Sequence, residues 1–201
     1  MSPSINVALT VRRTEAEGPG ARFAIWVQGC PLRCPGCCNP EMLDAGIART
    51  AMSPEALLRD IAQADVEGIS LLGGEPFAQA PGLASVAEGA QAAGLSVMVF
   101  SGHLLTQLQR RAQAEPGVAR LLAATDLLVD GPYLAAKRTT TRRYIGSNNQ
   151  GLHFLTDRYQ PDDPRFSAPN HLELHLSGGV LTVNGYPVLG ARTQISGVGK
   201  P

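Results

Sequence analysis

The stretch Gly29-Cys30-Pro31-Leu32-Arg33-Cys34-Pro35-Gly36-Cys37-Cys38 is the most informative part of this sequence. It holds all four cysteines of the 201-residue chain, with three and then two residues between the first three. Three thiolates so spaced on one loop can wrap one face of a cubane iron–sulfur cluster and leave its fourth iron without a protein ligand. An open coordination position is what separates a reactive metal site from a structural one.

Two other interpretations of these cysteines stay open, a structural zinc site and a closed cluster with Cys38 as its fourth ligand. Adjacent Cys37 and Cys38 are poorly placed to bind one ion, because neighbouring side chains of an extended segment point to opposite sides. The loop has no carboxylate or histidine, which favours soft iron–sulfur or zinc chemistry over hard metals. Cys38 is then either a neighbour of the cluster or a packed, inert thiol.

The composition predicts one soluble catalytic domain over residues 1–201, with a loose tail at 190–201. The 17 basic and 17 acidic residues balance, so no net charge attracts nucleic acid or an anionic membrane. The chain has no apolar run of about 18 residues to span a bilayer and no secretory signal at its N-terminus. We therefore expect a cytoplasmic protein, with no nucleic-acid or membrane partner, whose thiols stay reduced.

The apolar pattern outside the cysteine loop predicts strands that alternate with helices. Strands are expected over 6–11, 23–27, 69–72, 95–100 and 127–129, with helices over 53–61, 82–93 and 104–114. Two further alternating runs predict a terminal β-hairpin over 172–176 and 180–183. Alternating strands and helices imply a parallel sheet, either open or part of a barrel, with functional groups at the carboxyl ends of its strands.

A second motif, Leu71-Leu72-Gly73-Gly74-Glu75-Pro76, lies where a predicted buried strand runs into a loop. Its two glycines let a ligand approach the backbone, and the Glu75 carboxylate could pair with a ligand ammonium group. Alone, the motif could equally be a turn. It follows the cysteine loop by about one βα unit.

With both motifs, the chain resembles the radical S-adenosylmethionine superfamily, whose signature is a Cys-x3-Cys-x2-Cys loop followed by Gly-Gly-Glu-Pro. The resemblance implies a partial (βα)6 TIM-like barrel that carries the C-terminal β-hairpin. It also implies a 4Fe-4S cluster that binds S-adenosylmethionine at its open iron and reductively cleaves it to a 5′-deoxyadenosyl radical. A cluster with so low a reduction potential would need a flavodoxin- or ferredoxin-like electron donor. The implied cluster ligands are Cys30, Cys34 and Cys37, and the implied methionine-binding residues are Gly73, Gly74 and Glu75.

Further cofactor contacts follow from the same resemblance. The family usually places a large residue near the adenine, just before the third cysteine, where this chain has Gly36. Backbone contacts from Gly36, Cys37 and Cys38 could still serve there. Ser101 and Asp130 each follow a predicted strand and are further candidates, although a helix N-cap and a turn-forming Asp-Gly are the plainer interpretations.

Three stretches resemble activating enzymes of glycyl radical proteins, namely 14–23, Asp130-Gly131-Pro132-Tyr133 and Gly146-Ser147-Asn148-Asn149-Gln150. This likeness implies abstraction of a glycine hydrogen on a partner such as anaerobic ribonucleotide reductase. Such a step needs no base or nucleophile, so no catalytic side chain is assigned. The alternatives are a radical enzyme for a peptide or small metabolite, and a non-catalytic iron–sulfur or zinc module. The basic stretch 137–143 is either a solvated loop or a dock for an acidic partner.

Overall fold

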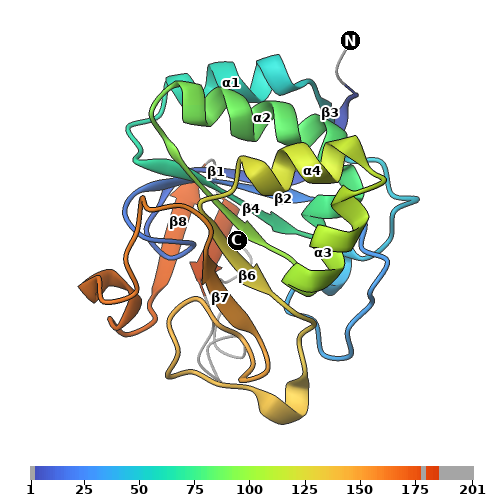
Figure 1. Ribbon diagram of the computed structural model, residues 1–201. Helices are drawn as coiled ribbons and strands as arrows, with labels where there is room; N and C mark the ends of the chain where they lie inside the picture. Colours follow the sequence, from blue (N-terminus) through green and yellow to red (C-terminus); the bar gives the residue numbers. More distant parts are fainter. Residues whose placement is uncertain (1–2, 178–179, 186–201) are drawn as a thin grey trace, which may run out of the picture.

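The computed structural model describes residues 3–177 and 180–185, which form a mixed α/β fold around a twisted sheet (Figure 1). The strands of this sheet are β1 (Ile5–Thr14), β2 (Arg22–Val27), β3 (Thr50–Met52), β4 (Gly68–Gly73), β5 (Ser96–Phe100), β6 (Leu127–Asp130) and β7 (Gly151–Phe154). A separate hairpin consists of β8 (Leu172–Ser177) and β9 (Val180–Gly185). The α-helices are α1 (Pro54–Ala62), α2 (Ala80–Ala92), α3 (Leu105–Ala112) and α4 (Pro116–Ala123). Single 3-10 turns are η1 (Pro40–Met42), η2 (Pro76–Gln79), η3 (Ala135–Lys137) and η4 (Pro164–Phe166).

The sheet has seven strands in the order β3-β1-β2-β4-β5-β6-β7. Strands β2, β4, β5 and β6 are parallel neighbours. β1 runs antiparallel to β2 and β3, and β7 runs antiparallel to β6. The parallel strands are connected through α1, then α2, then α3 and α4. Their carboxyl ends therefore meet at one edge of the sheet, which is where ligands bind in such folds.

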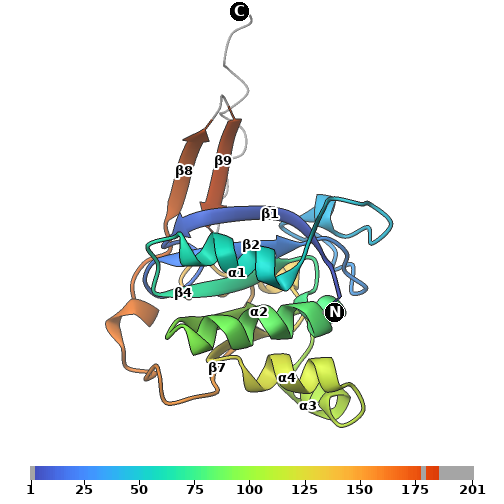
Figure 2. The ribbon, with the colours of Figure 1, turned by 90° about the horizontal axis from the view of Figure 1, so that it is seen from above.

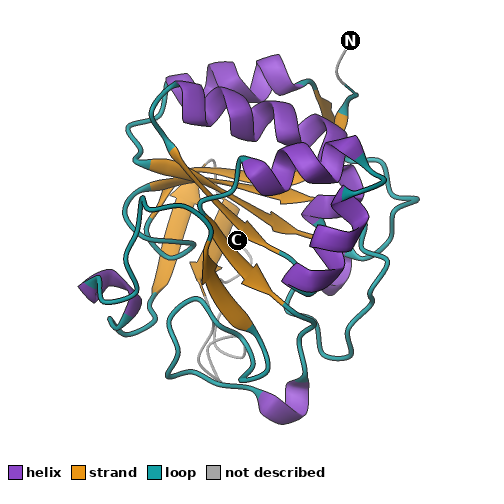
Figure 3. Cartoon of the chain, in the orientation of Figure 1, coloured by secondary structure: helices purple, strands orange, loops and turns teal. Residues whose placement is uncertain are grey.

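Side chains alternate between the two faces of the sheet because a strand has a period of two residues. On β4, Ile69 and Leu71 pack with the helices in the main core, whereas Leu72 belongs to a separate cluster on the other face. Figure 3 shows the α-helices gathered on the first face. Their contribution to that core includes Leu57, Ile61, Leu83, Val86, Leu108, Val118 and Leu121.

The opposite face of the sheet is covered by the hairpin and by loops. In Figure 2, β8 and β9 project on the side of the sheet away from α2 and α4. Two hydrogen bonds tie the base of the hairpin to the turn after β1, from the Glu15 amide to the Glu173 carboxylate (2.7 Å) and from the Gly185 amide to Glu17 Oε1 (2.8 Å). The hairpin thus forms a wall beside the helix-free face.

Most predicted elements are found close to their expected bounds. Ser53 caps α1 as predicted, because its side chain accepts the Ala56 amide at 3.2 Å and Pro54 occupies the first helical turn. The first two predicted strands, over 6–11 and 23–27, correspond to β1 and β2, which pair as an antiparallel hairpin. The prediction missed β3, β7 and α4, which are short elements at the sheet edges and in the last crossover. The expected tail at 190–201 lies outside the described residues.

Of the expected partial (βα)6 barrel, the described residues show the coarser part, a mixed α/β fold with a central, mostly parallel sheet, and fewer than six βα units. Within residues 3–177 and 180–185, four strands are parallel and the sheet ends at two unpaired edges, β3 and β7. The reason is that β1, β3 and β7 enter antiparallel, which ends the βα repeat on both sides. In the described residues, no helix has the length and apolar character needed to cross a membrane.

Candidate active site

A cavity of about 360 Å³ opens at the carboxyl edge of the parallel strands, on the helix-free face. Its wall includes residues that directly follow all four parallel strands, together with inward-facing side chains of the sheet. The loop contribution includes Cys30, Cys34, Cys37, Cys38, Gly73, Gly74, Glu75, Ser101, Gly102 and Gly131. The sheet contributes Leu9, Trp26, Leu72, Phe100 and Val129. The structure therefore brings both sequence motifs to one cavity.

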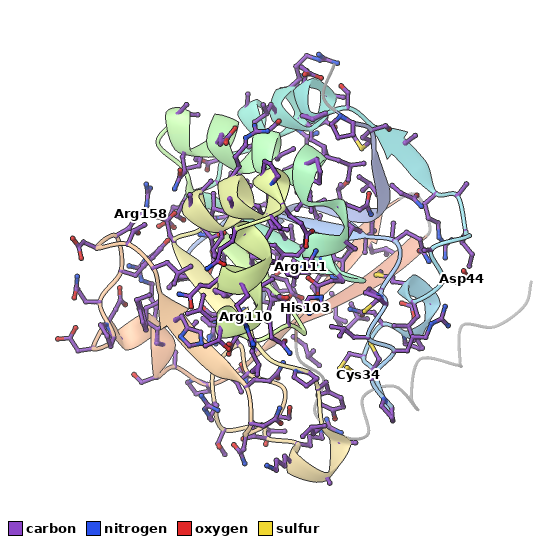
Figure 4. All side chains as sticks on the ribbon, turned by 45° about the vertical axis from the view of Figure 1, so that its right-hand side comes forward. Cys34, Asp44, His103, Arg110, Arg111 and Arg158 are labelled. Carbon is purple, nitrogen blue, oxygen red and sulfur yellow. The ribbon has the colours of Figure 1, made fainter. Side chains whose placement is uncertain are left out.

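The cysteine loop begins where β2 ends, and its stem is held by the segment that contains η1. The Gly29 amide donates to the Met42 carbonyl (2.9 Å), and the Cys30 amide donates to the Leu43 carbonyl (3.0 Å). Between these stems the four cysteines are partly exposed and form no disulfide. Figure 4 shows Cys34 on this loop, at the open side of the molecule.

The thiols of Cys30, Cys34 and Cys37 line the cavity together. Burial raises the pKa of the Cys30 and Cys37 thiols, so both are protonated until a metal displaces the protons. Among the described residues, no three His, Cys, Asp or Glu side chains converge on one ion. In a cubane, each thiolate binds a different iron, so convergence on one point is not required. The residues present fit a three-cysteine cluster.

The glycines after β4 allow the backbone to run unusually close to the end of β2. The Gly74 amide donates to the Val27 carbonyl (2.7 Å), and the Glu75 amide donates to the Gly29 carbonyl (2.9 Å). A Cβ on Gly74 would lie 2.2 Å from the Gly29 carbonyl oxygen, and Gly73 has a φ of +104°. Both positions therefore require glycine, and the two loops are locked together beneath the cavity.

The Glu75 carboxyl lies in the cavity wall, fully buried, and accepts three hydrogen bonds. The donors are the Phe77 amide (2.9 Å), the Ser101 hydroxyl (3.0 Å) and the Gly102 amide (2.9 Å). Burial raises the pKa of Glu75, and these donors oppose the rise. No cation of the described residues forms a salt bridge with it. A buried carboxyl of this kind fits a ligand ammonium group.

Ser101 and Asp130 have different surroundings: Ser101 directly follows β5, and Asp130 is the last residue of β6. Ser101 lines the cavity and orients Glu75. Asp130 lies between Val129 and Gly131, which both line the cavity, and its contact to the cofactor stays a prediction. Its carboxylate accepts the Leu105 amide at the start of α3 (2.7 Å) and the Gly151 amide (3.1 Å). This carboxylate therefore joins α3 to β7.

An aromatic ring lies beside Gly36, supplied by a residue that the sequence reasoning did not assign. Tyr133 lines the cavity, and its ring carbon Cε1 would lie 3.7 Å from a Cβ on Gly36. Tyr133 belongs to the Asp-Gly-Pro-Tyr stretch, so the residue type was visible but its proximity to the cysteine loop was not. Cys38 also lines the cavity, as a neighbour of the expected ligands.

The stretch from Gly146 to Gln150 forms the lower wall of the cavity. Gln150 Oε1 accepts the amides of Gly146 (3.1 Å) and Ser147 (3.0 Å), while its Nε2 donates to the Gly131 carbonyl (2.9 Å). Arg142 in the neighbouring basic stretch donates to the Gln150 carbonyl (2.9 Å). Arg142 therefore serves this loop rather than projecting into solvent.

Two further arginines, Arg143 of the basic stretch and Arg111 of α3, have their guanidinium groups engaged within the fold. Arg143 donates to the Pro169 carbonyl, and its guanidinium lies 4.9 Å from the centroid of the Tyr144 ring. Arg111 in α3, labelled in Figure 4, donates to the Phe77 carbonyl just after Glu75 (3.3 Å) and pairs with Glu115 at 2.9 Å. These contacts hold loops and helices together around the cavity.

Comparisons with known proteins agree with this geometry. Residues 16–153 match the family described as a 4Fe-4S single cluster domain. The chain therefore belongs to this iron–sulfur family and, with its two motifs, to the radical S-adenosylmethionine superfamily of enzymes. Its cofactors are a 4Fe-4S cluster and S-adenosylmethionine. These conclusions confirm the recognition made from the cysteine and glycine motifs.

Relatives of this chain indicate which branch of the superfamily it resembles. The anaerobic ribonucleoside-triphosphate reductase-activating protein of Salmonella typhi is 30% identical over 147 residues, which cover 69% of this chain and 92% of that protein. The protein of the same name from Escherichia coli K12 is 29% identical over 147 residues, with the same coverage of both chains. The pyruvate formate-lyase-activating enzyme of Listeria monocytogenes is 29% identical over 158 residues, covering 72% of this chain and 61% of that enzyme. The chain thus belongs with the activating proteins.

Among solved structures, the crystal structure of QueE from Escherichia coli is similar to this chain with a TM-score of 0.39 and 20% sequence identity. The similarity covers 51% of this chain and 53% of QueE.

Proposed function

We propose that this protein installs a glycyl radical on a partner protein, as an activating enzyme of the anaerobic ribonucleotide reductase type. The observation that carries the proposal is that one cavity is lined both by Cys30, Cys34 and Cys37 and by the Gly73-Gly74-Glu75 loop. When bound, the cluster and S-adenosylmethionine supply an electron and a 5′-deoxyadenosyl radical. The protein supplies position and shielding for that chemistry.

The residues of the cavity divide the binding task. The three cysteines would hold the cluster, while the backbone of Gly73 and Gly74 and the Glu75 carboxylate would bind the methionine moiety. Glu75 suits this role because it is buried without an ion-pair partner in the described chain. The backbone of Gly36, Cys37 and Cys38 borders the adenine, and the Tyr133 ring offers the stacking surface that Gly36 lacks. Asp130, which holds α3 to β7, remains a candidate contact of the cofactor.

The apolar floor of the cavity keeps water away from the radical. Trp26, Leu72 and Phe100 face the cavity from adjacent strands. Hydrogen-atom transfer needs the glycine Cα held against the donor carbon in a water-poor place. A flexible glycine-bearing loop of the partner could enter from the open side, beyond the cysteine loop.

The reduction that starts the chemistry requires a low-potential donor, since iron–sulfur potentials reach about −700 mV at their lower end. We propose a flavodoxin- or ferredoxin-like protein that approaches the partly exposed cysteine loop. We place this chemistry in the cytoplasm, where reductants keep the four thiols available.

Anaerobic reconstitution tests the proposed cleavage. The full-length protein, loaded with iron and sulfide and reduced with dithionite, should convert S-adenosylmethionine into 5′-deoxyadenosine and methionine. The product is measured by liquid chromatography, with Cys34→Ala as the matched control that lacks one cluster ligand. A properly loaded wild-type protein that forms no 5′-deoxyadenosine would refute the proposal.

The alternatives make different predictions in the same preparation. A modifier of a peptide or small metabolite would form 5′-deoxyadenosine but leave no stored radical on a partner protein. A non-catalytic module would hold zinc, or a cluster that never turns over S-adenosylmethionine. Metal analysis after anaerobic purification separates the zinc case at once.

A further inference from the structure

A second hollow, the outer groove, lies against the cysteine loop. It measures about 390 Å³, and its wall consists of Asn6, Gln28, Gly29, Cys30, Pro31, Arg33, Leu43, Ala45, Ala78 and Gln79. Leu32 and Cys34 line the S-adenosylmethionine cavity. Pro31 and Arg33, which alternate with them along the loop, line the outer groove instead. Cys30 lines both hollows, so this expected cluster ligand borders the groove as well as the cavity.

The polar side chains in the wall of the outer groove are already used by the fold. Gln28 Nε2 donates to the carbonyls of Glu41 (3.1 Å) and Asp44 (2.8 Å), and neither of these acidic residues belongs to the lining itself. Gln79 Oε1 accepts the Asn6 amide (2.7 Å), and its Nε2 donates to the Gln28 carbonyl (2.9 Å). Within the described residues, the wall therefore lacks the free, converging polar groups that fix a small metabolite.

The exposed part of the wall is apolar and carries one positive charge. Pro31 and Ala45 are exposed, and Arg33, also exposed, is the only charged residue of the lining. Arg33 forms no salt bridge with any residue of the described chain. A second exposed cation, Arg49, lies beside the groove, with its Nε bonded to Gln28 Oε1 (3.2 Å). Exposed apolar surface with cations at its rim suits a protein partner that carries carboxylates.

The reaction needs a second approach to the cluster. S-adenosylmethionine fills the cavity when the cluster is reduced, and the glycine loop of the partner enters from the open side of the same cavity. An electron donor therefore needs a separate route, and the outer groove leads to Cys30 without passing through the cavity. The isoalloxazine ring of a flavin has an apolar dimethylbenzene edge, which matches the apolar rim. One electron passes from the reduced flavin to the cluster, and no bond is formed or broken.

We propose that the outer groove is the docking site of a flavodoxin-like electron donor. The flavin edge lies at the apolar rim beside Cys30, and carboxylates of the donor surround Arg33. This inference rests on the proposed function, because it assumes a cluster on the three cysteines and a reduction that precedes cleavage. It adds the face of the molecule on which the donor binds and the charge that the donor must carry.

Calorimetric titration with oxidised Escherichia coli flavodoxin tests the charge complementarity. The full-length, cluster-loaded protein is kept oxidised with S-adenosylmethionine bound, so no turnover takes place. Arg33→Glu should raise the Kd by about 3- to 10-fold at low salt, the range expected when one exposed attraction becomes a repulsion. The difference should shrink at about 0.5 M salt, because salt screens exposed charges. Arg59→Glu, on the exposed side of α1, is the matched control and should bind flavodoxin as wild type does.

Ala45→Glu is a second variant, outside the cysteine loop. It places a carboxylate in the outer groove and should raise the Kd to a similar extent, so a disturbed cysteine loop cannot account for the result. In both variants, the rate of 5′-deoxyadenosine formation driven by reduced flavodoxin should fall relative to the rate driven by dithionite, which needs no docking. Iron content and circular dichroism confirm that each variant is loaded and folded.

Hydrogen–deuterium exchange of the wild-type protein locates the donor without any variant. Added flavodoxin should protect backbone amides over 29–33 and 43–47, and leave those over 101–104 and 131–134 at the cavity unchanged. Protection confined to the second pair of segments, no binding of flavodoxin, or an unchanged Kd in both groove variants would each overturn the inference. Formation of 5′-deoxyadenosine with dithionite reports separately on the proposed function. A protein that cleaves S-adenosylmethionine but binds flavodoxin elsewhere would fail only the inference about the groove.

Discussion

The two loops that would hold the cofactor are built in opposite ways. The glycine loop is fixed by the fold, because the Gly74 and Glu75 amides bond to the carbonyls of Val27 and Gly29 and leave no space for a side chain at Gly74. The cysteine loop at 30–38 is partly exposed, and its backbone turns through the left-handed region at Arg33 (φ 47°) and Gly36 (φ 75°). The cavity is thus bounded by a tightly packed loop on one side and by a partly exposed loop on the other.

Removing a cluster ligand should have the largest effect on activity and leave the apo fold almost unchanged. Cys34→Ala should abolish cluster binding and 5′-deoxyadenosine formation, because the cluster would lose one of its three thiolate ligands. The apo fold should keep its stability within about 0.5 kcal/mol, since the loop is at the surface. Iron and sulfide analysis with thermal unfolding of the apo protein measures both effects.

Cys38→Ala is the matched control within the same loop. It should retain wild-type iron and sulfide, because Cys38 is expected beside the cluster rather than as a ligand. Loss of iron in this variant would contradict the three-cysteine assignment.

A substitution in the glycine loop should lower the stability of the fold rather than the metal content of the protein. Gly74→Ala places a Cβ 2.2 Å from the Gly29 carbonyl oxygen, so backbone must move. We expect a loss of about 2–4 kcal/mol in the free energy of unfolding, typical of a strained or overpacked buried site. Denaturant titration of the apo protein measures it. Gly46→Ala, in an exposed turn without backbone contacts this close, is the control and should cost well under half as much.

Tyr133 belongs to neither loop, yet its ring lies beside Gly36 of the cysteine loop. Tyr133→Ala should weaken S-adenosylmethionine binding by about 1–3 kcal/mol, the usual value of stacking between a base and an aromatic ring. Tyr133→Phe should bind like wild type, because the ring is kept. Equilibrium dialysis with the cluster-loaded protein gives both affinities. An alanine variant of unchanged affinity would remove Tyr133 from the proposed adenine site.

Sequence patterns predicted the half of the site that lies on short local motifs. The three cysteines and Gly73-Gly74-Glu75 could be assigned because spacing and residue type carry the chemistry. Tyr133 could not, since its place depends on how distant strands assemble around one cavity. For Asp130, the place at the end of a strand could be predicted from the sequence. The hydrogen bonds that its carboxylate accepts from the amides of Leu105 and Gly151 could not.

The fold was predicted to a similar extent and for similar reasons. Long apolar runs identified the parallel strands, and the Ser53-Pro54 signal identified the start of α1. The edge strands β3 and β7 have few buried residues, so their apolar signal is weak. Their antiparallel entry decides that the sheet stays open, and no local pattern reports the direction of pairing.

The smallest expected effect comes from the hairpin base, which lies away from both loops. Burial, with repulsion from Glu173, raises the pKa of Glu17 to about 7 from an unfolded value near 4.5. The folded state then binds the extra proton between these two values, so stability should fall as pH rises from about 4.5 to about 7 and stay level above. We expect about 1 kcal/mol in global unfolding, because the hairpin base can open locally.

Glu17→Gln checks the origin of this pH dependence. The amide keeps an acceptor for the Gly185 amide but does not titrate, so its stability profile should be flatter than that of wild type over the same range. Equal slopes in the two proteins would assign the pH dependence to another group.

Isotope transfer from the substrate glycine tests the central claim most directly. The reduced, cluster-loaded protein is incubated with S-adenosylmethionine and a glycyl radical protein labelled with dideuterated glycine, and the 5′-deoxyadenosine is analysed by mass spectrometry. The account predicts a product heavier by one deuterium, together with a stored glycyl radical in the electron paramagnetic resonance spectrum. Unlabelled 5′-deoxyadenosine and no glycyl signal, from a protein that cleaves S-adenosylmethionine, would contradict it.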